Sequence, residues 1–379
     1  MGVGLPTAGA SAPQPAVAAG PAAFLTRAPQ PALAPARLQH LLQLCGPADG
    51  ALLRAAGKLL EAPLATLPLN AENVTFAVRT AGGPYVRAQG LRVKLPNANP
   101  EAIEDAVNTW LSGTDVVQYR RCGMAVREDS GTHVQNFAMV MARASAELAG
   151  LPSRVPHGSR LQFRARSYLP ITNAELLVME PTGAVRHISS QLSGDRISAG
   201  FYLDTRGTHK IQLMVDYEGG PEPALEAWVA VDEPFRGPRV EEIAKVEAGT
   251  ALDGHDDERL LGMINRARSS IGVAPLVRSP ALDRVAQAHA RAMQRQGRLA
   301  HDLGQGDPVF RVQEANVFSK TTGENLARAI SVERGHRGVL ASPSHRENLL
   351  AAHFDKVGIG IARDPSGQLW ICELLVDQD

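Results

Sequence analysis

Apolar residues in the N-terminal third recur at helical spacing in two places. Between residues 36 and 61, leucines recur at helical spacing, three, four or seven positions apart, on either side of a Gly-Pro pair. This predicts two amphipathic helices with a break between them. Residues 100–111 repeat this pattern and predict a third helix. Shorter apolar runs at 74–78 and 91–95 are interpreted as strands.

A hairpin follows these elements. Residues 124–126 and 134–141 are largely apolar, and the polar segment 128–131 between them is typical of a turn. Helices combined with a hairpin predict an α+β domain over residues 37–150. The preceding segment, residues 1–36, is rich in Ala, Pro and Gly and nearly free of charge, so we expect a disordered leader there.

The middle of the chain alternates between apolar and polar positions with a period of two. Between residues 151 and 235, such segments recur about every ten residues, with Gly and Pro between them. This spacing predicts a central antiparallel β-sandwich of the immunoglobulin or fibronectin type III style. The polar residues 236–254, which include Gly and Pro, are interpreted as a linker.

Helices and a final antiparallel pair are predicted for residues 255–379. Residues 256–270 and 282–296 each carry apolar residues on one helical face, and a glycine follows each segment closely. Ser342 before a proline is typical of a helix start. Residues 357–362 alternate as a strand and lead into a turn and a second strand.

The N-terminal hairpin has a counterpart at the C-terminus. The mutual spacing of Arg127, Ser130 and Gly131 recurs within residues 363–367. Residues 37–145 are therefore interpreted as a degenerate copy of the C-terminal fold that kept the scaffold and lost the polar site. The alternative, which the sequence leaves open, is an unrelated α+β domain whose hairpin matches by chance.

Length, charge and hydropathy limit the kinds of protein that this sequence can encode. The length of 379 residues predicts roughly two or three domains. Thirty-nine Lys and Arg balance 39 Asp and Glu, which argues against a general polyanion-binding surface such as one for nucleic acid and leaves a local basic patch open. No apolar run approaches the about 18 residues of a membrane span, so no transmembrane segment is expected. Residues 1–26 contain no Lys or Arg and so lack the basic start of a signal peptide.

Cysteine is scarce. Three cysteines are too few for a disulfide framework. Cys45 and Cys122 can pair if their elements pack together, and the sequence leaves this open. Cys372 lies in an apolar strand and is interpreted as a buried thiol.

Five segments near the C-terminus occur in the order of a known family. They are LLGMINRARSSIGVAPL (260–276), LDRVAQAHARAMQRQGRLAH (282–301), GENLA (323–327), SPSHRENLL (342–350) and VGIGIARDPSGQLW (357–370). Together they resemble the CAP or SCP domain of the cysteine-rich secretory, antigen 5 and pathogenesis-related-1 superfamily, in its bacterial form. The resemblance implies a three-layer α-β-α sandwich and a location that is extracellular or in the cell envelope.

The resemblance also implies a cleft that holds His301, Glu324 and His345. Two imidazoles and a carboxylate can bind a divalent cation such as Zn²⁺. Glu324 and His345 are each expected at the start of a helix, where the dipole stabilises a carboxylate and keeps an imidazole neutral. Without the resemblance, capping would be the simpler interpretation of both residues.

Residues around these three are expected to support the cleft. Asn325 follows Glu324, and Arg346 and Asn348 complete the SPxHRxN motif and are expected to brace the cleft by hydrogen bonds. The eukaryotic family members have a second glutamate, for which Glu333 and Glu347 are candidates by residue type only.

The other histidines are expected to be structural. His289 lies on the apolar face of its helix and is interpreted as a core histidine, while His336 and His353 are interpreted as solvated. No GxSxG, HExxH, phosphate-binding loop or dinucleotide motif occurs.

Three functions remain open from the sequence. The leading hypothesis is an exported binding protein whose cleft holds zinc and an extracellular ligand, which family members suggest is a lipid, a peptide or a protein. The second is a zinc-assisted extracellular hydrolase with Glu324 as general base. The third is a wall-associated structural protein with an idle cleft.

Overall fold

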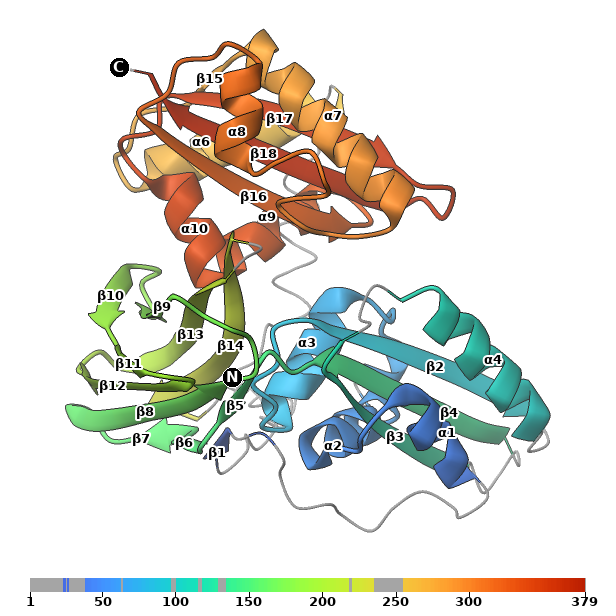
Figure 1. Ribbon diagram of the computed structural model, residues 1–379. Coiled ribbons are helices and arrows are strands. Elements are labelled where there is room, and N and C mark those ends of the chain that lie inside the picture. Colours follow the sequence, from blue (N-terminus) through green and yellow to red (C-terminus); the bar gives the residue numbers. More distant parts are fainter. Residues whose placement is uncertain are drawn as a thin grey trace, which may run out of the picture.

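The computed structural model describes residues 23–24, 26, 38–62, 64–96, 100–114, 118–128, 134–217, 220–234 and 255–378. These residues form an N-terminal α+β body, a central β-sandwich and a C-terminal α-β-α body (Figure 1). The predicted α+β fold class is therefore confirmed. The predicted linker and nearly all of the predicted leader lie outside the described residues.

The N-terminal sheet has the strand order β2-β4-β3. Its strands are β2 (Ala88–Pro96), β3 (Arg120–Glu128) and β4 (Val134–Arg143), and β4 pairs antiparallel with both neighbours. Its helices are α1 (Gln39–Cys45), α2 (Gly50–Leu59), α3 (Ala71–Thr80) and α4 (Pro100–Ser112), with a short 3₁₀ turn, η2, at Leu64–Thr66. Alternate residues of β4 enter two separate cores, one shared with α2 and α3 and one with α1 and α4.

The strand predicted at residues 74–78 is wrong, because this segment lies within helix α3. Asn70 caps the helix by accepting a hydrogen bond from the backbone N–H of Asn73 at 2.9 Å. Val74, Ala77 and Val78 are buried on one side of α3. A five-residue apolar window is compatible with either a strand or a buried helical turn, and here packing against α2 decides for the helix.

A disulfide joins Cys45 at the end of α1 to Cys122 in β3. The pairing that the sequence left open is thus formed, across 77 positions of the chain. Cys372 is a free and fully buried cysteine, as expected.

The central sandwich consists of sheets with strand orders β10-β9-β13-β14-β7 and β11-β12-β8-β5. Its strands are β5 (Ala146–Leu148), β6 (Leu151–Pro152), β7 (Arg154–Val155), β8 (Ser159–Ser167), β9 (Asn173–Met179), β10 (Val185–Ser189), β11 (Gln191–Ser193), β12 (Arg196–Leu203), β13 (Gly207–Tyr217) and β14 (Gly220–Val231). Strand β1 (Ala23–Phe24) pairs with β6, and Phe24 is fully buried in the sandwich core. At these two residues the predicted disordered leader is wrong, because the sandwich offers an apolar site for Phe24.

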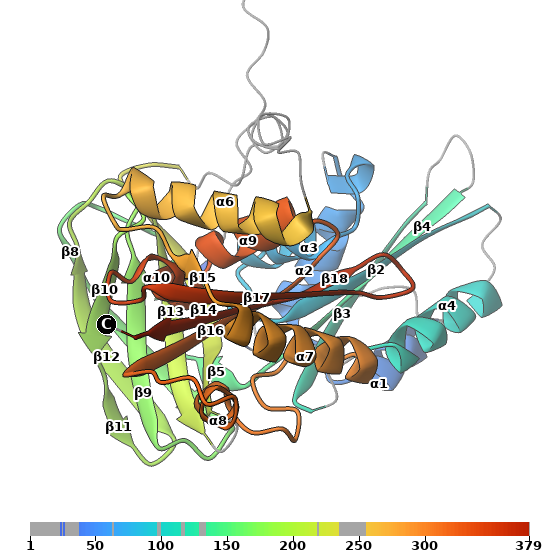
Figure 2. The same ribbon diagram turned by 90° about the horizontal axis from the view of Figure 1, so that it is seen from above.

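The C-terminal sheet has the strand order β15-β17-β18-β16. Its strands are β15 (Val277–Arg278), β16 (Thr321–Ala329), β17 (Lys356–Arg363) and β18 (Leu369–Asp377), and its helices are α6 (Asp256–Ser270), α7 (Pro280–Gln296), α8 (Pro308–Glu314), α9 (Val332–Ala341) and α10 (Pro343–Leu350). Helices α7 and α8 lie on one side of the sheet and α6 and α9 on the other, which gives three layers (Figure 2).

The two α+β bodies share a strand order, since β3-β4-β2 corresponds to β17-β18-β16. In both, the first hairpin strand carries a glycine that lies against a helix. A Cβ at Gly123 would lie 2.1 Å from the backbone of Leu52 in α2, and a Cβ at Gly358 would lie 2.3 Å from the backbone of Leu282 in α7. Gly123 and Arg127 are four residues apart, whereas Gly358 and Arg363 are five apart, so the glycines and the hairpin spacing do not align in one register. The degenerate-copy interpretation stays a prediction.

Candidate functional site

Glu324 is the centre of a buried polar cluster in the C-terminal body. Its side chain is 1% exposed. His301 Nδ1 lies 2.8 Å from Oε1, and the Arg311 guanidinium donates to Oε2 at 2.7 Å. The Cys372 thiol also donates to Oε2, at 3.3 Å. Both carboxylate oxygens are therefore bound by groups of the protein.

The prediction that Glu324 begins a helix is wrong. The residue lies inside β16 and pairs with β18, so alternation along the strand sets its direction. Glu324 faces α7 and α8, while the next residue, Asn325, faces α10. The carboxylate is stabilised by side-chain donors and not by a helix dipole.

The segment between α7 and α8 brings His301 and Arg311 to Glu324. Gly297 ends α7 in the left-handed conformation, with φ at 62°, and the chain reverses toward His301. Asp307 caps α8 by accepting from the Phe310 N–H at 2.8 Å. Arg311 on α8 also donates to the His301 carbonyl at 3.0 Å, so one guanidinium holds both the loop and the carboxylate.

The charges of this cluster follow from its burial. Burial by itself raises the pKa of Glu324, but the hydrogen bond from His301 and the positive charge of Arg311 outweigh it and leave the pKa lowered. Burial and the nearby Glu324 carboxylate raise the pKa of Cys372, so the thiol stays protonated. At neutral pH, Glu324 is an ionised carboxylate that is neutralised by Arg311.

His289 is buried beside this cluster. Its Nε2 lies 2.9 Å from the Ala300 carbonyl and 3.9 Å from Glu324 Oε1. Burial lowers its pKa. A core position was expected for this histidine and is found. His336 is also buried, at 7% exposure, so the predicted solvated position is wrong, whereas His353 is exposed.

Asn325 links the GENLA and SPSHRENLL motifs on the other face of the sheet. Its amide donates to the His345 carbonyl at 3.0 Å and to Glu373 at 3.2 Å, and Asn348 donates to its oxygen at 3.3 Å. Asn325 and Asn348 thus fix α10 against β16, while their predicted support of a cleft stays a prediction.

Glu373 is a buried acidic residue that no sequence motif predicts. It is 1% exposed on β18, opposite Asn325, and its Oε1 has no hydrogen-bond partner among the described residues. Burial raises its pKa to about 7. The sequence does mark it, because Glu373 is the one acidic residue in the otherwise apolar strand LWICELLV. The candidates Glu333 and Glu347 instead pair with Arg259 and His187.

His345 is not part of the Glu324 cluster. Within the described residues its imidazole makes no hydrogen bond or ion pair with His301 or Glu324. Burial, with a smaller contribution from the nearby charge of His301, lowers its pKa to about 4. The imidazole is neutral, as predicted, but mainly because of burial and not because of the helix dipole.

The N-terminal turn of α10 contacts the sandwich. Gln212 on β13 accepts from the Ser344 N–H at 3.1 Å and donates to the Ser342 hydroxyl at 3.3 Å. Gln212 also donates to Glu226 at 3.2 Å, and Glu226 pairs with Arg79 of α3 at 3.3 Å. The turn that carries His345 is thus part of a buried junction between all three bodies.

Arg346 also points to the sandwich. It donates to the Gly183 carbonyl at 2.8 Å, and the neighbouring Glu347 pairs with His187. Lys210 donates to the Ala341 carbonyl at the end of α9. The prediction that Arg346 braces the cleft is wrong, because its guanidinium lies on the interdomain side of α10.

The three predicted ligands do not fit a zinc site as they lie. Glu324 offers no free oxygen, since Arg311, His301 and Cys372 occupy both. Across the described ranges, no group of three or more His, Cys, Asp or Glu side chains is arranged to hold a metal ion. A cation at this place would have the second nitrogen of His301 as its ligand, with Glu324 orienting the ring.

Comparisons with known proteins place a family match on this body. Residues 261–374 match the family described as the cysteine-rich secretory protein family, CAP. No curated protein matches the chain in sequence.

Solved structures similar to the chain include three bacterial proteins. An outer surface protein of Borrelia burgdorferi is 22% identical, with 38% of this chain and 97% of that chain covered and a TM-score of 0.31. An extracellular SCP-domain protein of Bacillus anthracis is 16% identical, with 62% and 86% covered and a TM-score of 0.30. A cysteine-rich secretory protein of Staphylococcus aureus is 12% identical, with 68% and 83% covered and a TM-score of 0.28.

Proposed function

Because residues 261–374 are a CAP domain, we propose that this protein is exported and binds an extracellular ligand through His301, without hydrolysing it. The ligand class expected from the family is a lipid, a peptide or a protein. One feature supports export: the Cys45–Cys122 disulfide is typical of oxidising compartments.

The observation that carries the binding proposal is the way Glu324 holds His301. The His301 side chain is 28% exposed, and its Nδ1 is tied to the buried carboxylate. The other ring nitrogen, Nε2, has no hydrogen-bond partner among the described residues and remains for a ligand. A ring oriented in this way presents a polar atom at a fixed position, which suits recognition of a hydroxyl or carboxyl group.

The same contacts argue against the hydrolase hypothesis. A general base needs a pKa near the working pH and a free lone pair directed at its substrate. Glu324 has a lowered pKa and is enclosed by protein donors. It is therefore a positioning residue for His301 in this proposal.

The test compares the full chain with His301→Ala and with the control His353→Ala, which changes an exposed histidine outside the site. Binding of a fluorescent fatty acid and of a fluorescent peptide library is measured by anisotropy. We expect saturable binding of one of these ligands. Its affinity should fall at least about tenfold in His301→Ala, because one charged or buried hydrogen bond is lost. It should be unchanged in His353→Ala. Equal affinity in all three proteins would contradict the proposal.

A second measurement separates binding from hydrolysis. The same ligand, or an ester of it, is incubated with the full chain and with Glu324→Gln, and products are followed by mass spectrometry. We expect no turnover by either protein. Turnover that Glu324→Gln abolishes would instead establish the hydrolase function.

A further inference from the structure

Three polar residues lie in one row at the end of the N-terminal sheet. Lys94 on β2 is opposite Asn136 on β4, and Asn136 is opposite Arg127 on β3. Residues directly opposite each other project from the same face, and adjacent strands are about 4.8 Å apart. The row therefore places one amide between two cations on a single face of the sheet.

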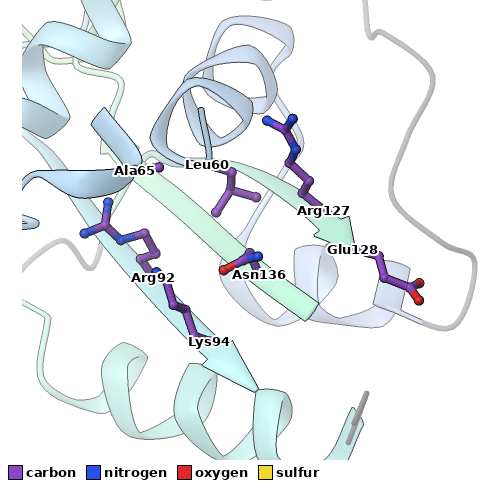
Figure 3. Close-up of a pocket in the computed structure, with 7 residues that line it drawn as sticks. All are labelled: Leu60, Ala65, Arg92, Lys94, Arg127, Glu128 and Asn136. Atoms are coloured by element: carbon purple, nitrogen blue, oxygen red, sulfur yellow. The ribbon is translucent and has the colours of Figure 1, made fainter. Parts of the chain in front are cut away.

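This row borders a pocket of about 380 Å³. Leu60, just after α2, and Ala65 in η2 also line it (Figure 3). The preceding row on this face, which contains Ala138, is buried under the helices. The helices thus end before the row of Lys94, Asn136 and Arg127, and the sheet face is open there.

Lys94 and Arg127, the two cations of this row, make no stabilising polar contact within the described part of the chain. Lys94 and Arg127 are exposed, and neither forms an ion pair or a side-chain hydrogen bond within the described part of the chain. Glu128 also lines the pocket, but its carboxylate is directed away from Asn136 (Figure 3). Two uncompensated cations beside an open polar pocket suit a negatively charged ligand.

Arg92 adds a third positive charge to the wall. Its guanidinium donates to the carbonyls of Leu64 and Leu67 at 2.8 and 2.6 Å, and to that of Leu59 at 3.4 Å. Leu59 is the last residue of α2, Leu64 is the first residue of η2 and Leu67 follows η2. The negative end of the α2 dipole would repel an anion. Because Arg92 binds carbonyls and not a carboxylate, its charge is not neutralised.

The C-terminal body is different at the row that lies four residues beyond Gly358, as Arg127 lies four residues beyond Gly123. There, Arg328 lies opposite Trp370, which is 2% exposed, and the guanidinium stacks 4.6 Å from the indole ring. Counted from the glycines in this way, Asn136 is opposite Arg127 in the N-terminal sheet and Trp370 is opposite Ala362 in the C-terminal sheet.

Gly90 lies four residues before Lys94 on β2, and Glu324 lies four residues before Arg328 on β16. By this count, the N-terminal sheet has a glycine where the C-terminal sheet has the buried glutamate. The N-terminal body thus lacks the carboxylate and has a basic pocket instead.

We propose that this pocket binds a phosphate group through Lys94, Arg127 and Asn136. Arginine and lysine are the side chains that most often bind phosphate oxygens, and the amide of Asn136 supplies a neutral donor between them. The phosphate can belong to a free small molecule or to a phosphodiester polymer. Both sources offer the same chemistry to the pocket.

The experiment is calorimetric titration of the full chain with inorganic pyrophosphate at fixed ionic strength. The test variant is Lys94→Gln/Arg127→Gln. The control is Arg160→Gln/Arg164→Gln, which removes the same charge from exposed positions of β8. Arg92 is left intact because it holds backbone carbonyls. A third variant, Asn136→Leu, keeps all cations and fills the row with an apolar side chain.

We expect affinity for pyrophosphate to fall at least tenfold in the test variant and in Asn136→Leu, and to be unchanged in the control. Unaltered thermal unfolding temperatures would exclude misfolding as the cause. Absence of binding by the wild type, or equal weakening in test and control variants, would overturn the proposal.

A second arm identifies the source of the phosphate. The titration is repeated with a short poly(glycerol phosphate) at the same phosphate concentration. Tighter binding of the polymer, again lost in Lys94→Gln/Arg127→Gln, would assign the pocket to a phosphodiester polymer. Similar or weaker binding of the polymer would assign it to a small phosphorylated ligand.

Discussion

The Arg311 guanidinium donates to Glu324 Oε2 at 2.7 Å, with the side chains 7% and 1% exposed. This ion pair changes the role that can be assigned to Glu324 of the GENLA motif. The carboxylate that the sequence suggested as a metal ligand or a base is already paired and hydrogen-bonded inside the protein. Its remaining task is to hold the ring of His301.

Arg311→Met should strongly destabilise the CAP domain. The substitution leaves the buried Glu324 carboxylate without its cation, and breaking one side of such a pair costs about 3–5 kcal/mol. The free energy of unfolding from urea titration measures the effect. The double variant Arg311→Met/Glu324→Leu should recover much of the loss, because an apolar pair replaces both charges.

The matched control for this prediction is Arg166→Met. Arg166 forms an ion pair with Asp195 at 2.6 Å, but its side chain is 62% exposed. Solvent screens such a pair, so little change is expected. A loss as large as that of Arg311→Met would show that the effect is not due to burial.

Zinc should not bind tightly to the Glu324 cluster. Calorimetric titration of the full chain with zinc chloride should show no saturable one-to-one binding in the micromolar range, because Glu324 has no free oxygen for the ion. The variants His301→Ala and Glu324→Gln are titrated in parallel. One-to-one binding by the wild type that is lost in both variants would restore the three-ligand hypothesis.

Glu373 should make the CAP domain less stable as the pH rises. Burial raises its pKa from 4.5 to about 7, so the folded protein binds a proton that the unfolded chain releases in this range. The stabilisation is complete below about pH 4.5 and is lost as the pH approaches 7, at about 1.4 kcal/mol for each pKa unit.

The variant Glu373→Gln tests this assignment, since glutamine keeps the shape and cannot ionise. We expect a flatter dependence of unfolding free energy on pH between 4.5 and 7, and a gain in stability at pH 8 relative to the wild type. An unchanged slope would mean that another group causes the pH dependence.

His345 should titrate near pH 4 in the folded protein. Its lowered pKa means that the unfolded chain takes up the proton first, so its contribution to stability is present above about pH 6.5 and is lost as the pH falls toward 4. An NMR titration of the imidazole protons measures the midpoint. A midpoint near 6.5 would contradict burial of the ring at the junction.

The contacts of Gln212 provide a mutational test of the same junction. Gln212→Ala removes the hydrogen bonds to Ser342 and Ser344, which should loosen α10 and raise the pKa of His345. Gln162→Ala is the control, because Gln162 is exposed on β8 in the other sheet of the sandwich. An identical His345 titration in both variants would show that Gln212 does not hold α10 in place.

The Cys45–Cys122 disulfide should stabilise the N-terminal body. Replacing both cysteines by alanine should lower the free energy of unfolding by about 2–4 kcal/mol, because the bond restricts a long loop in the unfolded chain. Dithiothreitol should lower the stability of the wild type to a similar level and leave the double variant unchanged. Insensitivity of the wild type to reductant would argue against the bond.

The sequence by itself determined the elements that depend on local pattern. The helix pair around Gly46, the hairpin after residue 120, the sandwich strands and the Ser-Pro start of α10 follow from spacing within about ten residues. The order of five CAP motifs located the third body. Short apolar windows were ambiguous, as the helix at 74–78 shows, because both periods fit five residues.

Only the tertiary structure decided which polar groups meet. Arg311 and Glu324 are 13 positions apart and come together through the turn before α8, while Glu373 reaches Asn325 by sheet register. His345 lies in the first turn of α10, at a helix start as predicted, yet its neighbours Ser344 and Arg346 contact the sandwich. Such contacts depend on how the layers and bodies pack against one another. The local sequence pattern does not specify which residue of another layer or body will be the partner.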